Sequence, residues 1–134
     1  MENRDILIDT SIIIEFLRKY NKSDTYLWKI KEKGYYCYIS TITVFEIYAG
    51  AITEKHEEDL KKLLKWMEII PFTRDIAKRA ASIYKELRLK NQLIEFRDIF
   101  IGATSLEASI PIITLNYNHF KRINGIKIYK KEDI

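Results

Sequence analysis

The chain has 134 residues, of which 47% are hydrophobic and 31% charged, proportions typical of one globular domain and not of a disordered chain. Its formal net charge of +4 favours polyanionic partners only mildly. One cysteine, Cys37, excludes an internal disulfide and fits a reducing compartment, and with only His56 and His119 beside it the chain lacks a Cys/His zinc site.

The chain ends and the apolar stretches give no sign of export or membrane insertion. The charged N-terminus does not resemble a signal peptide, and the longest uncharged stretch, residues 34–45, falls short of the roughly 20 residues of a membrane span. We therefore expect a cytoplasmic protein with no membrane contact, folded as one domain over residues 1–134.

The first third of the chain reads as two strand–helix units. Residues 6–8 form an apolar run typical of a buried strand, and residues 9–11 supply N-cap chemistry for a helix over 12–19. Ser23 and Asp24 are expected to cap a second helix that Gly34 ends. A strand over 36–39 follows.

The rest of the chain continues the alternation. Ser40 and Thr41 open a helix that ends at Gly50, an amphipathic helix follows over 54–67, and a strand over 68–72 precedes a helix capped by Thr73. A helix over 98–108 and strands over 112–114 and 126–129 complete the chain. Strands that alternate with helices predict an α/β fold with a parallel sheet covered on both faces.

Three acidic residues occur where local context predicts burial or half-burial: Asp9, Glu46 and Asp98. Asp9 ends the first strand, Glu46 lies one turn into the helix after the second, and Asp98 begins its helix. Asn116 follows the fourth strand. Because ligands of open parallel sheets bind beyond the carboxyl ends of the strands, these four residues are expected to meet there.

The charges predict a cation at that edge. Two carboxylates about 4 Å apart repel by roughly 4 kcal/mol at an effective dielectric of 20, so three carboxylates require protonation or a cation. Mg²⁺ prefers a few carboxylates together with water and phosphate oxygens.

Each residue also has a plainer interpretation. Asp9 could be only a helix N-cap, Glu46 could form a structural salt bridge to a lysine or arginine, and Asp98 could complement the helix dipole or pair with Arg97. Asn116 is also an ordinary turn residue. His119 is interpreted as a loop or cap residue and is left out of the catalytic set.

Most basic residues are interpreted as the solvated faces of amphipathic helices. Arg18, Arg97 and Lys121 lie near the predicted edge and are the better candidates for phosphate contacts. Some of the tyrosines could stack on unpaired bases, namely Tyr20, Tyr35, Tyr36 and Tyr117.

Four motifs in this order resemble the PIN-domain family, and specifically the VapC-type toxins of toxin–antitoxin pairs. They are Ile8-Asp9-Thr10-Ser11, Val44-Phe45-Glu46-Ile47-Tyr48-Ala49-Gly50, Asp98-Ile99-Phe100-Ile101-Gly102-Ala103, and Ile113-Thr114-Leu115-Asn116-Tyr117-Asn118-His119-Phe120. No single motif is specific, but together they span nearly the whole chain.

The resemblance implies an α/β/α sandwich with a five-stranded parallel sheet and a Mg²⁺- or Mn²⁺-dependent endoribonuclease that uses metal-activated water. It also implies a cognate VapB-type antitoxin, and usually a homodimer. Asp9, Glu46 and Asp98 would be the metal ligands, with Asn116 where many members have a fourth acid; its neutral amide would bind a second metal more weakly than a carboxylate does. The side chains that could position water or a phosphate oxygen are Thr10, Ser11, Arg97 and Thr114.

Two other functions remain open on the sequence. The same fold could be a catalytically weak nucleic-acid-binding or regulatory module, because Asn116 is a weaker ligand than an acid. A phosphatase with Asp9 as nucleophile is disfavoured, because such enzymes usually carry a second Asp two residues on, where this chain has Ser11.

Overall fold

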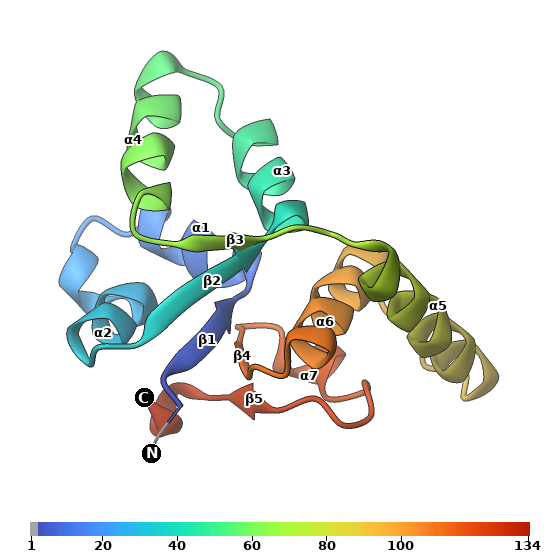
Figure 1. Cartoon of the computed structure of the whole chain (residues 1–134). Coiled ribbons are helices and arrows are strands. Elements are labelled where there is room, and N and C mark those ends of the chain that lie inside the picture. The colour runs from blue at the N-terminus through green and yellow to red at the C-terminus, as the bar shows by residue number, and fades with distance from the viewer. Residues whose placement is uncertain (1–2) are drawn as a thin grey trace.

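Five parallel strands form one sheet in the order β3-β2-β1-β4-β5, so that β1 is central (Figure 1). The structure is a computed structural model and describes residues 3–134, apart from the side chain of Lys131. The strands are β1 (Asp5–Ile8), β2 (Tyr36–Ser40), β3 (Glu68–Ile70), β4 (Ile112–Ile113) and β5 (Ile128–Tyr129). The predicted fold class is confirmed.

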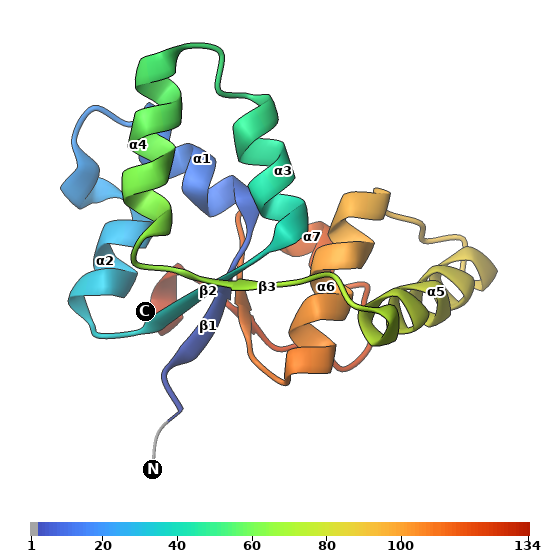
Figure 2. The ribbon, with the colours of Figure 1, turned by 45° about the horizontal axis from the view of Figure 1, so that its top comes forward.

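The helices divide between the two faces of the sheet in chain order. The first four pack mainly on one face, and the last three pack on the other (Figures 1 and 2). They are α1 (Thr10–Arg18), α2 (Tyr26–Glu32), α3 (Thr41–Ala49), α4 (Glu54–Leu64), α5 (Arg74–Leu89), α6 (Phe96–Ala108) and α7 (Tyr117–Phe120), with short 3-10 turns η1 (Lys22–Asp24) and η2 (Lys131–Asp133). In the described part of the chain, no helix is both long and apolar enough to cross a membrane.

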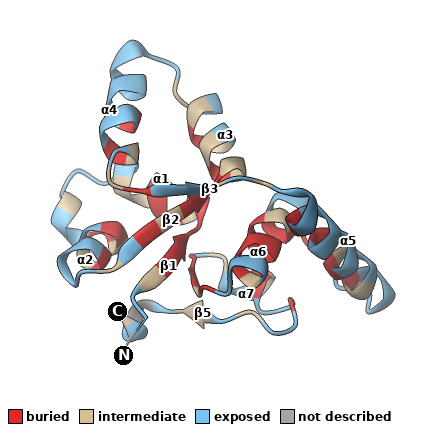
Figure 3. Cartoon of the chain, viewed as in Figure 1, coloured by how far each residue is buried: buried red, intermediate tan, exposed pale blue. Residues whose placement is uncertain are grey.

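Side-chain alternation along β1 divides the hydrophobic core in two. Ile6 and Ile8 pack with α1, α2 and α4, whereas Leu7 packs with α5 and α6 on the other face. All three side chains are fully buried, and Figure 3 shows burial concentrated in the sheet and on the helix faces turned toward it. A strand buried on both faces is expected when helices cover a parallel sheet from both sides.

Capping residues explain where most helices begin. Ser40, Thr53 and Thr73 each accept a backbone N–H bond at the start of α3, α4 and α5. The predicted cap of α2 was wrong: Thr25, which is fully buried, accepts the hydrogen bond from Trp28, while residues 22–24 form the preceding 3-10 turn. The buried Thr25 hydroxyl also donates to the carbonyl of Lys22 at 2.6 Å, so it both donates and accepts, as a buried polar group requires.

Several predicted boundaries shift at the ends of elements. The helix predicted over 54–67 ends at Leu64, and the strands predicted over 68–72, 112–114 and 126–129 are each shorter. The helix that carries Asp98 begins two residues earlier than predicted, at Phe96. The four-residue α7 was not predicted.

The thiol of Cys37 offers a test of how tightly β2 is buried. Cys37 is 5% exposed, and burial raises its pKa to about 11. The thiolate is the reactive form, and at pH 8 it makes up about 0.1% of such a thiol against about a quarter of a thiol with pKa 8.5. We expect a disulfide reagent to label the native protein at pH 8 at least about 100-fold more slowly than the protein in guanidinium chloride. Comparable rates would contradict the burial of β2.

Candidate active site

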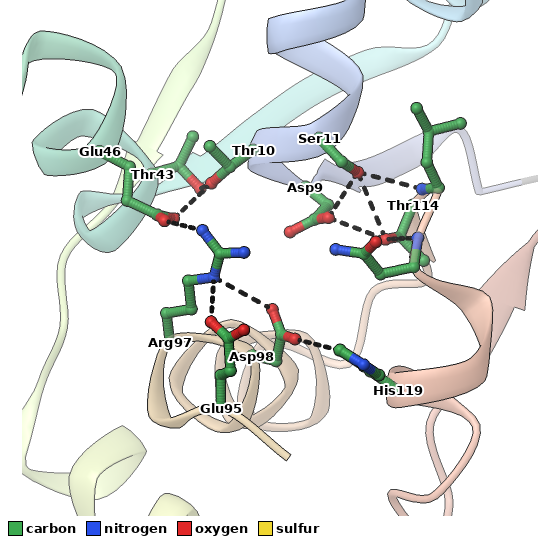
Figure 4. Close-up of polar contacts among 12 residues, drawn as sticks. Asp9, Thr10, Ser11, Thr43, Glu46, Glu95, Arg97, Asp98, Thr114 and His119 are labelled. Atoms are coloured by element: carbon green, nitrogen blue, oxygen red, sulfur yellow. Dashed lines mark hydrogen bonds and ion pairs between the residues drawn. The ribbon is translucent and has the colours of Figure 1, made fainter. Parts of the chain in front are cut away.

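The carboxylate of Asp9 lies at the end of the central strand and is held by two hydroxyl groups. Asp9 is 2% exposed, and its Oδ2 atom accepts hydrogen bonds from Ser11 Oγ at 2.7 Å and Thr114 Oγ1 at 2.8 Å (Figure 4). Backbone N–H groups donate to both hydroxyl oxygens, from Leu115 to Ser11 at 3.0 Å and from Asn116 to Thr114 at 2.9 Å. These N–H donors leave the hydroxyl protons directed at Asp9.

The charge of Asp9 is nevertheless unfavourable where it lies. Burial raises the pKa of Asp9 above its ordinary value, and the negative charge of Asp98 raises it further. Hydrogen bonds from Ser11 and Thr114 oppose the rise without cancelling it. Either a proton or a cation at the end of the central strand would relieve this cost.

Glu46 projects from α3 toward the same edge and has both carboxylate oxygens occupied. Thr10 Oγ1 donates to Oε1 at 2.8 Å, and Arg97 Nη1 donates to Oε2 at 2.7 Å. The Thr10 hydroxyl also lies 2.9 Å from that of Thr43 one turn before Glu46 on α3. The ion pair, weighed from sequence as the plainer interpretation of Glu46, is therefore present, and its partner is Arg97.

Asp98 lies in the first turn of α6 and is 2% exposed. Its Oδ2 atom is 2.8 Å from His119 Nδ1, and because an ionised carboxylate only accepts, the hydrogen bond places the proton on Nδ1. Its Oδ1 atom is 3.9 Å from Arg97 Nε, which is closer to Glu95 Oε2 at 3.0 Å. Figure 4 shows Arg97 between Glu46 and Asp98, with His119 on the opposite side of Asp98.

The Arg97 guanidinium joins acids from two helices. The hydrogen bond to Glu46 is the main reason that the pKa of Arg97 is raised, so this side chain stays charged. A cation in the first turn of a helix opposes the helix dipole, so α6 itself does not account for an arginine there. The neighbouring carboxylates do, because they gain a charge-assisted bond.

The other predicted residues have mixed placements. Thr10, Ser11 and Thr114 contact the acidic residues directly. The hydrogen bonds of Asn116 within residues 3–134 all run through its backbone, which begins α7 by accepting from His119 and Phe120. Its role as a metal ligand stays a prediction.

Sequence reasoning set His119 aside and did not single out Thr43 or Glu95. His119 is 21 residues from Asp98, and no sequence pattern links the two. Thr43 was recognisable only as one hydroxyl among several in residues 40–43. The Glu95–Arg97 ion pair is local. The Thr43 contact depends on how α1 meets α3 and the His119 contact on how α7 meets α6, which local patterns do not encode.

The donor set at this edge suits a hard cation. Figure 4 shows the carboxylates of Asp9 and Asp98 turned toward each other, with the guanidinium of Arg97 between them and Glu46. Carboxylate oxygens are the ligands that Mg²⁺ prefers. Within residues 3–134, however, no three His, Cys, Asp or Glu side chains stand close enough together to hold an ion as placed. Glu46 is the residue set apart, since Arg97 lies between it and Asp98.

Replacing Asp9 with Asn tests the unfavourable buried charge. A raised pKa means that the folded protein holds this proton more tightly than the unfolded chain, so the wild type loses stability as the pH rises from the ordinary value of 3.8 through the raised one. Asn keeps an oxygen for both hydroxyls and removes the ionisation. In EDTA at pH 7, we expect Asp9→Asn to raise Tm by a few degrees, with the gain shrinking as the pH falls toward 4.

The measurement is thermal unfolding by circular dichroism between pH 4 and pH 7. Asp75→Asn, at an exposed position in the first turn of α5, is the control and should lower Tm slightly at pH 7, because its carboxylate interacts favourably with the helix dipole. A variant at Asp9 that is less stable than the wild type at pH 7 would show that its two hydroxyl partners outweigh burial.

Comparison with known proteins adds family membership to this geometry. The PIN domain family matches residues 6–126. Ribonuclease VapC1 of Methanocaldococcus jannaschii is 31% identical over 132 residues, which cover 97% of this chain and 90% of that protein.

Solved structures share the fold over almost the whole chain. A toxin–antitoxin complex from Klebsiella pneumoniae matches with 25% identity and a TM-score of 0.75, covering 96% of this chain and 99% of the matched chain. The DNA-bound VapBC complex of Salmonella typhimurium matches with 22% identity and a TM-score of 0.84, covering 93% and 96%. The chain therefore belongs to the PIN-domain family and, within it, to the VapC group.

Proposed function

We propose that this protein is a divalent-metal-dependent endoribonuclease, a VapC-type toxin that acts in the cytoplasm as one nuclease domain over residues 1–134. The main support is that Asp9 and Asp98 lie buried at the carboxyl edge of the sheet, with Glu46 joined to Asp98 through Arg97 and each acid holding an oriented hydrogen-bond partner. Membership of the VapC group, in which the relative from Methanocaldococcus jannaschii is named a ribonuclease, supports the same conclusion.

Asp9, Glu46 and Asp98 would hold Mg²⁺ or Mn²⁺, since oxygen donors suit both cations. When bound, the cation supplies charge that stabilises the oxyanion of a phosphoryl displacement and makes water a better nucleophile. Asn116 would add at most a neutral oxygen, so the negative charge that balances the cation would come from the three carboxylates.

The remaining residues position these carboxylates. The Ser11 and Thr114 hydroxyls fix the orientation of Asp9, and Thr10 fixes one oxygen of Glu46. Arg97 has a guanidinium that matches phosphate oxygens as well as carboxylates, and its side chain is 46% exposed, so an RNA phosphate can reach it. His119 orients Asp98 through Nδ1.

Partners follow from the same relatives. The matched chains from Klebsiella and Salmonella come from toxin–antitoxin and VapBC complexes, which supports a VapB-type antitoxin that neutralises this protein. The substrate is RNA. A homodimer stays a prediction from the family resemblance.

Cleavage of total RNA by the purified chain tests the proposal. With Mg²⁺ or Mn²⁺ we expect discrete fragments, with EDTA none, and with Asp9→Asn a loss of at least about 100-fold, because a ligand and its charge are removed. End-mapping of the fragments by sequencing measures the activity, and Asp75→Asn serves as the matched carboxylate control.

Cleavage that persists in EDTA, or that survives Asp9→Asn, would rule out the metal-dependent site. RNA binding without cleavage under any metal condition would instead favour the alternative of a nucleic-acid-binding module. In that case Asn116→Asp, which supplies a fourth acid, is the substitution expected to restore turnover.

A further inference from the structure

Two lysines converge on one tyrosine beside the acidic residues. Lys130 Nζ lies 4.1 Å from the centre of the Tyr117 ring, and Lys121 Nζ lies 5.9 Å from it. Tyr117 opens α7, Lys121 follows its last residue, and Lys130 follows β5, so two segments of the chain build this cluster.

The register of the sheet places this cluster next to the candidate active site. Ile113 of β4 pairs with Tyr129 of β5 in parallel, so Thr114 and Lys130 leave the sheet at the same level on neighbouring strands. Adjacent strands are about 4.8 Å apart. Thr114 donates to Asp9, and the basic cluster therefore begins one strand away from the acidic one.

The cluster surrounds a hollow whose lining contains no acidic residue. The hollow has a volume of about 330 Å³ and is bounded by Tyr117, Lys121, Lys130 and the turn that contains Asn124 and Gly125. Within residues 3–134, neither ammonium group lies within ion-pair distance of a carboxylate. Asp133, three residues further along the chain, accepts a hydrogen bond from the backbone N–H of Lys130 and not from its ammonium group.

Stability alone does not account for this arrangement. An exposed cation–π pair contributes about 0.5–1 kcal/mol, and two ammonium groups at one ring repel each other. An anion between the two lysines would relieve the repulsion, and the tyrosine offers a partly exposed π-face beside it. Phosphate and an unpaired base are the groups that this combination recognises.

We propose that Tyr117, Lys121 and Lys130 form a subsite for single-stranded RNA next to the cleaved phosphodiester. A flanking base stacks on the Tyr117 ring, and the lysines contact flanking phosphates. The subsite rests on the proposed ribonuclease function. It places the path of the RNA along the sheet edge, from β1 past β4 to β5.

Binding of a fluorescein-labelled, mixed-sequence single-stranded RNA of about 12 nucleotides tests the subsite. The full chain carrying Asp9→Asn is used in EDTA, so that binding is measured without cleavage, and fluorescence anisotropy gives Kd at several salt concentrations. Lys121→Gln, Lys130→Gln, Tyr117→Leu and Tyr117→Phe are each added to this background. Lys31→Gln is the matched control, because Lys31 lies 4.5 Å from the Trp66 ring in another part of the molecule.

Each lysine substitution should lower the slope of log Kd against log salt by about 0.7, the value for one phosphate contact of a single strand. Tyr117→Leu should weaken binding about tenfold with the salt slope unchanged, and Tyr117→Phe should retain affinity, because the ring is what stacks. The same RNA annealed to its complement should respond to the lysines but not to Tyr117→Leu, since paired bases cannot stack on the ring. Lys31→Gln should change neither quantity.

Unchanged slopes in both lysine variants, or equal effects of Lys31→Gln, would overturn the subsite. Equal weakening of single-stranded and duplex RNA by Tyr117→Leu would overturn the stacking contact. Failure of the Asp9→Asn chain itself to bind the RNA would also overturn it. The wild type is assayed separately for cleavage of total RNA: cleavage with unchanged slopes refutes the subsite alone, whereas absence of cleavage refutes the ribonuclease.

Discussion

Burial of the Asp9 carboxylate at the end of the central strand is the constraint on which the rest of the site depends. A charge buried in that position needs hydrogen-bond donors that are held in place, and the order of the strands in the sheet brings such donors to it. β1 lies between β2 and β4, so the segment after β1 provides Ser11 and the segment after β4 provides Thr114. Strand order reverses between β1 and β4, and ligands of open parallel sheets bind at such a position. The same arrangement that fills the core with β1 therefore also creates the polar site at its end.

Ion pairs and hydrogen bonds between helices position the other two carboxylates, those of Glu46 and Asp98. Glu46 on α3 and Asp98 on α6 approach each other with Arg97 between them, and His119 on α7 binds Asp98 from the other side. Because the guanidinium reaches both acids, the position of α6 relative to α3 is set partly by charge and partly by the core beneath. A site built in this way keeps its acidic residues near one another without placing their oxygens in contact. It also gives Glu46 two competing partners, since a cation would have to share this carboxylate with Arg97.

Local sequence patterns were enough to predict the strands, the longer helices and the acidic residues, but not the partners of those residues. Apolar runs and capping residues located all five strands, and the position of Asp9, Glu46 and Asp98 relative to them predicted the common edge. The cap of α2 was missed because Thr25 caps from a buried position, and α7 was missed because four residues carry no periodicity. Arg97 and Glu46 are 51 residues apart, and His119 and Asp98 are 21 apart. Such pairs follow from helix packing, so the sequence alone does not distinguish His119 from an ordinary loop residue.

The charge along the carboxyl edge of the sheet changes from negative to positive, and the net charge of +4 does not reveal this. Asp9 follows β1, the neutral hydroxyl of Thr114 follows β4, and Lys130 follows β5, with Lys121 close to the same Tyr117 ring. A polyanion cleaved at the acidic end needs opposite charge nearby, because the carboxylates by themselves repel it. Parallel register is what makes the two ends neighbours, since it brings Thr114 and Lys130 to the same level although 16 residues separate them in sequence. Position along the edge, more than total charge, thus decides which part of the surface can face a cation and which part a phosphate.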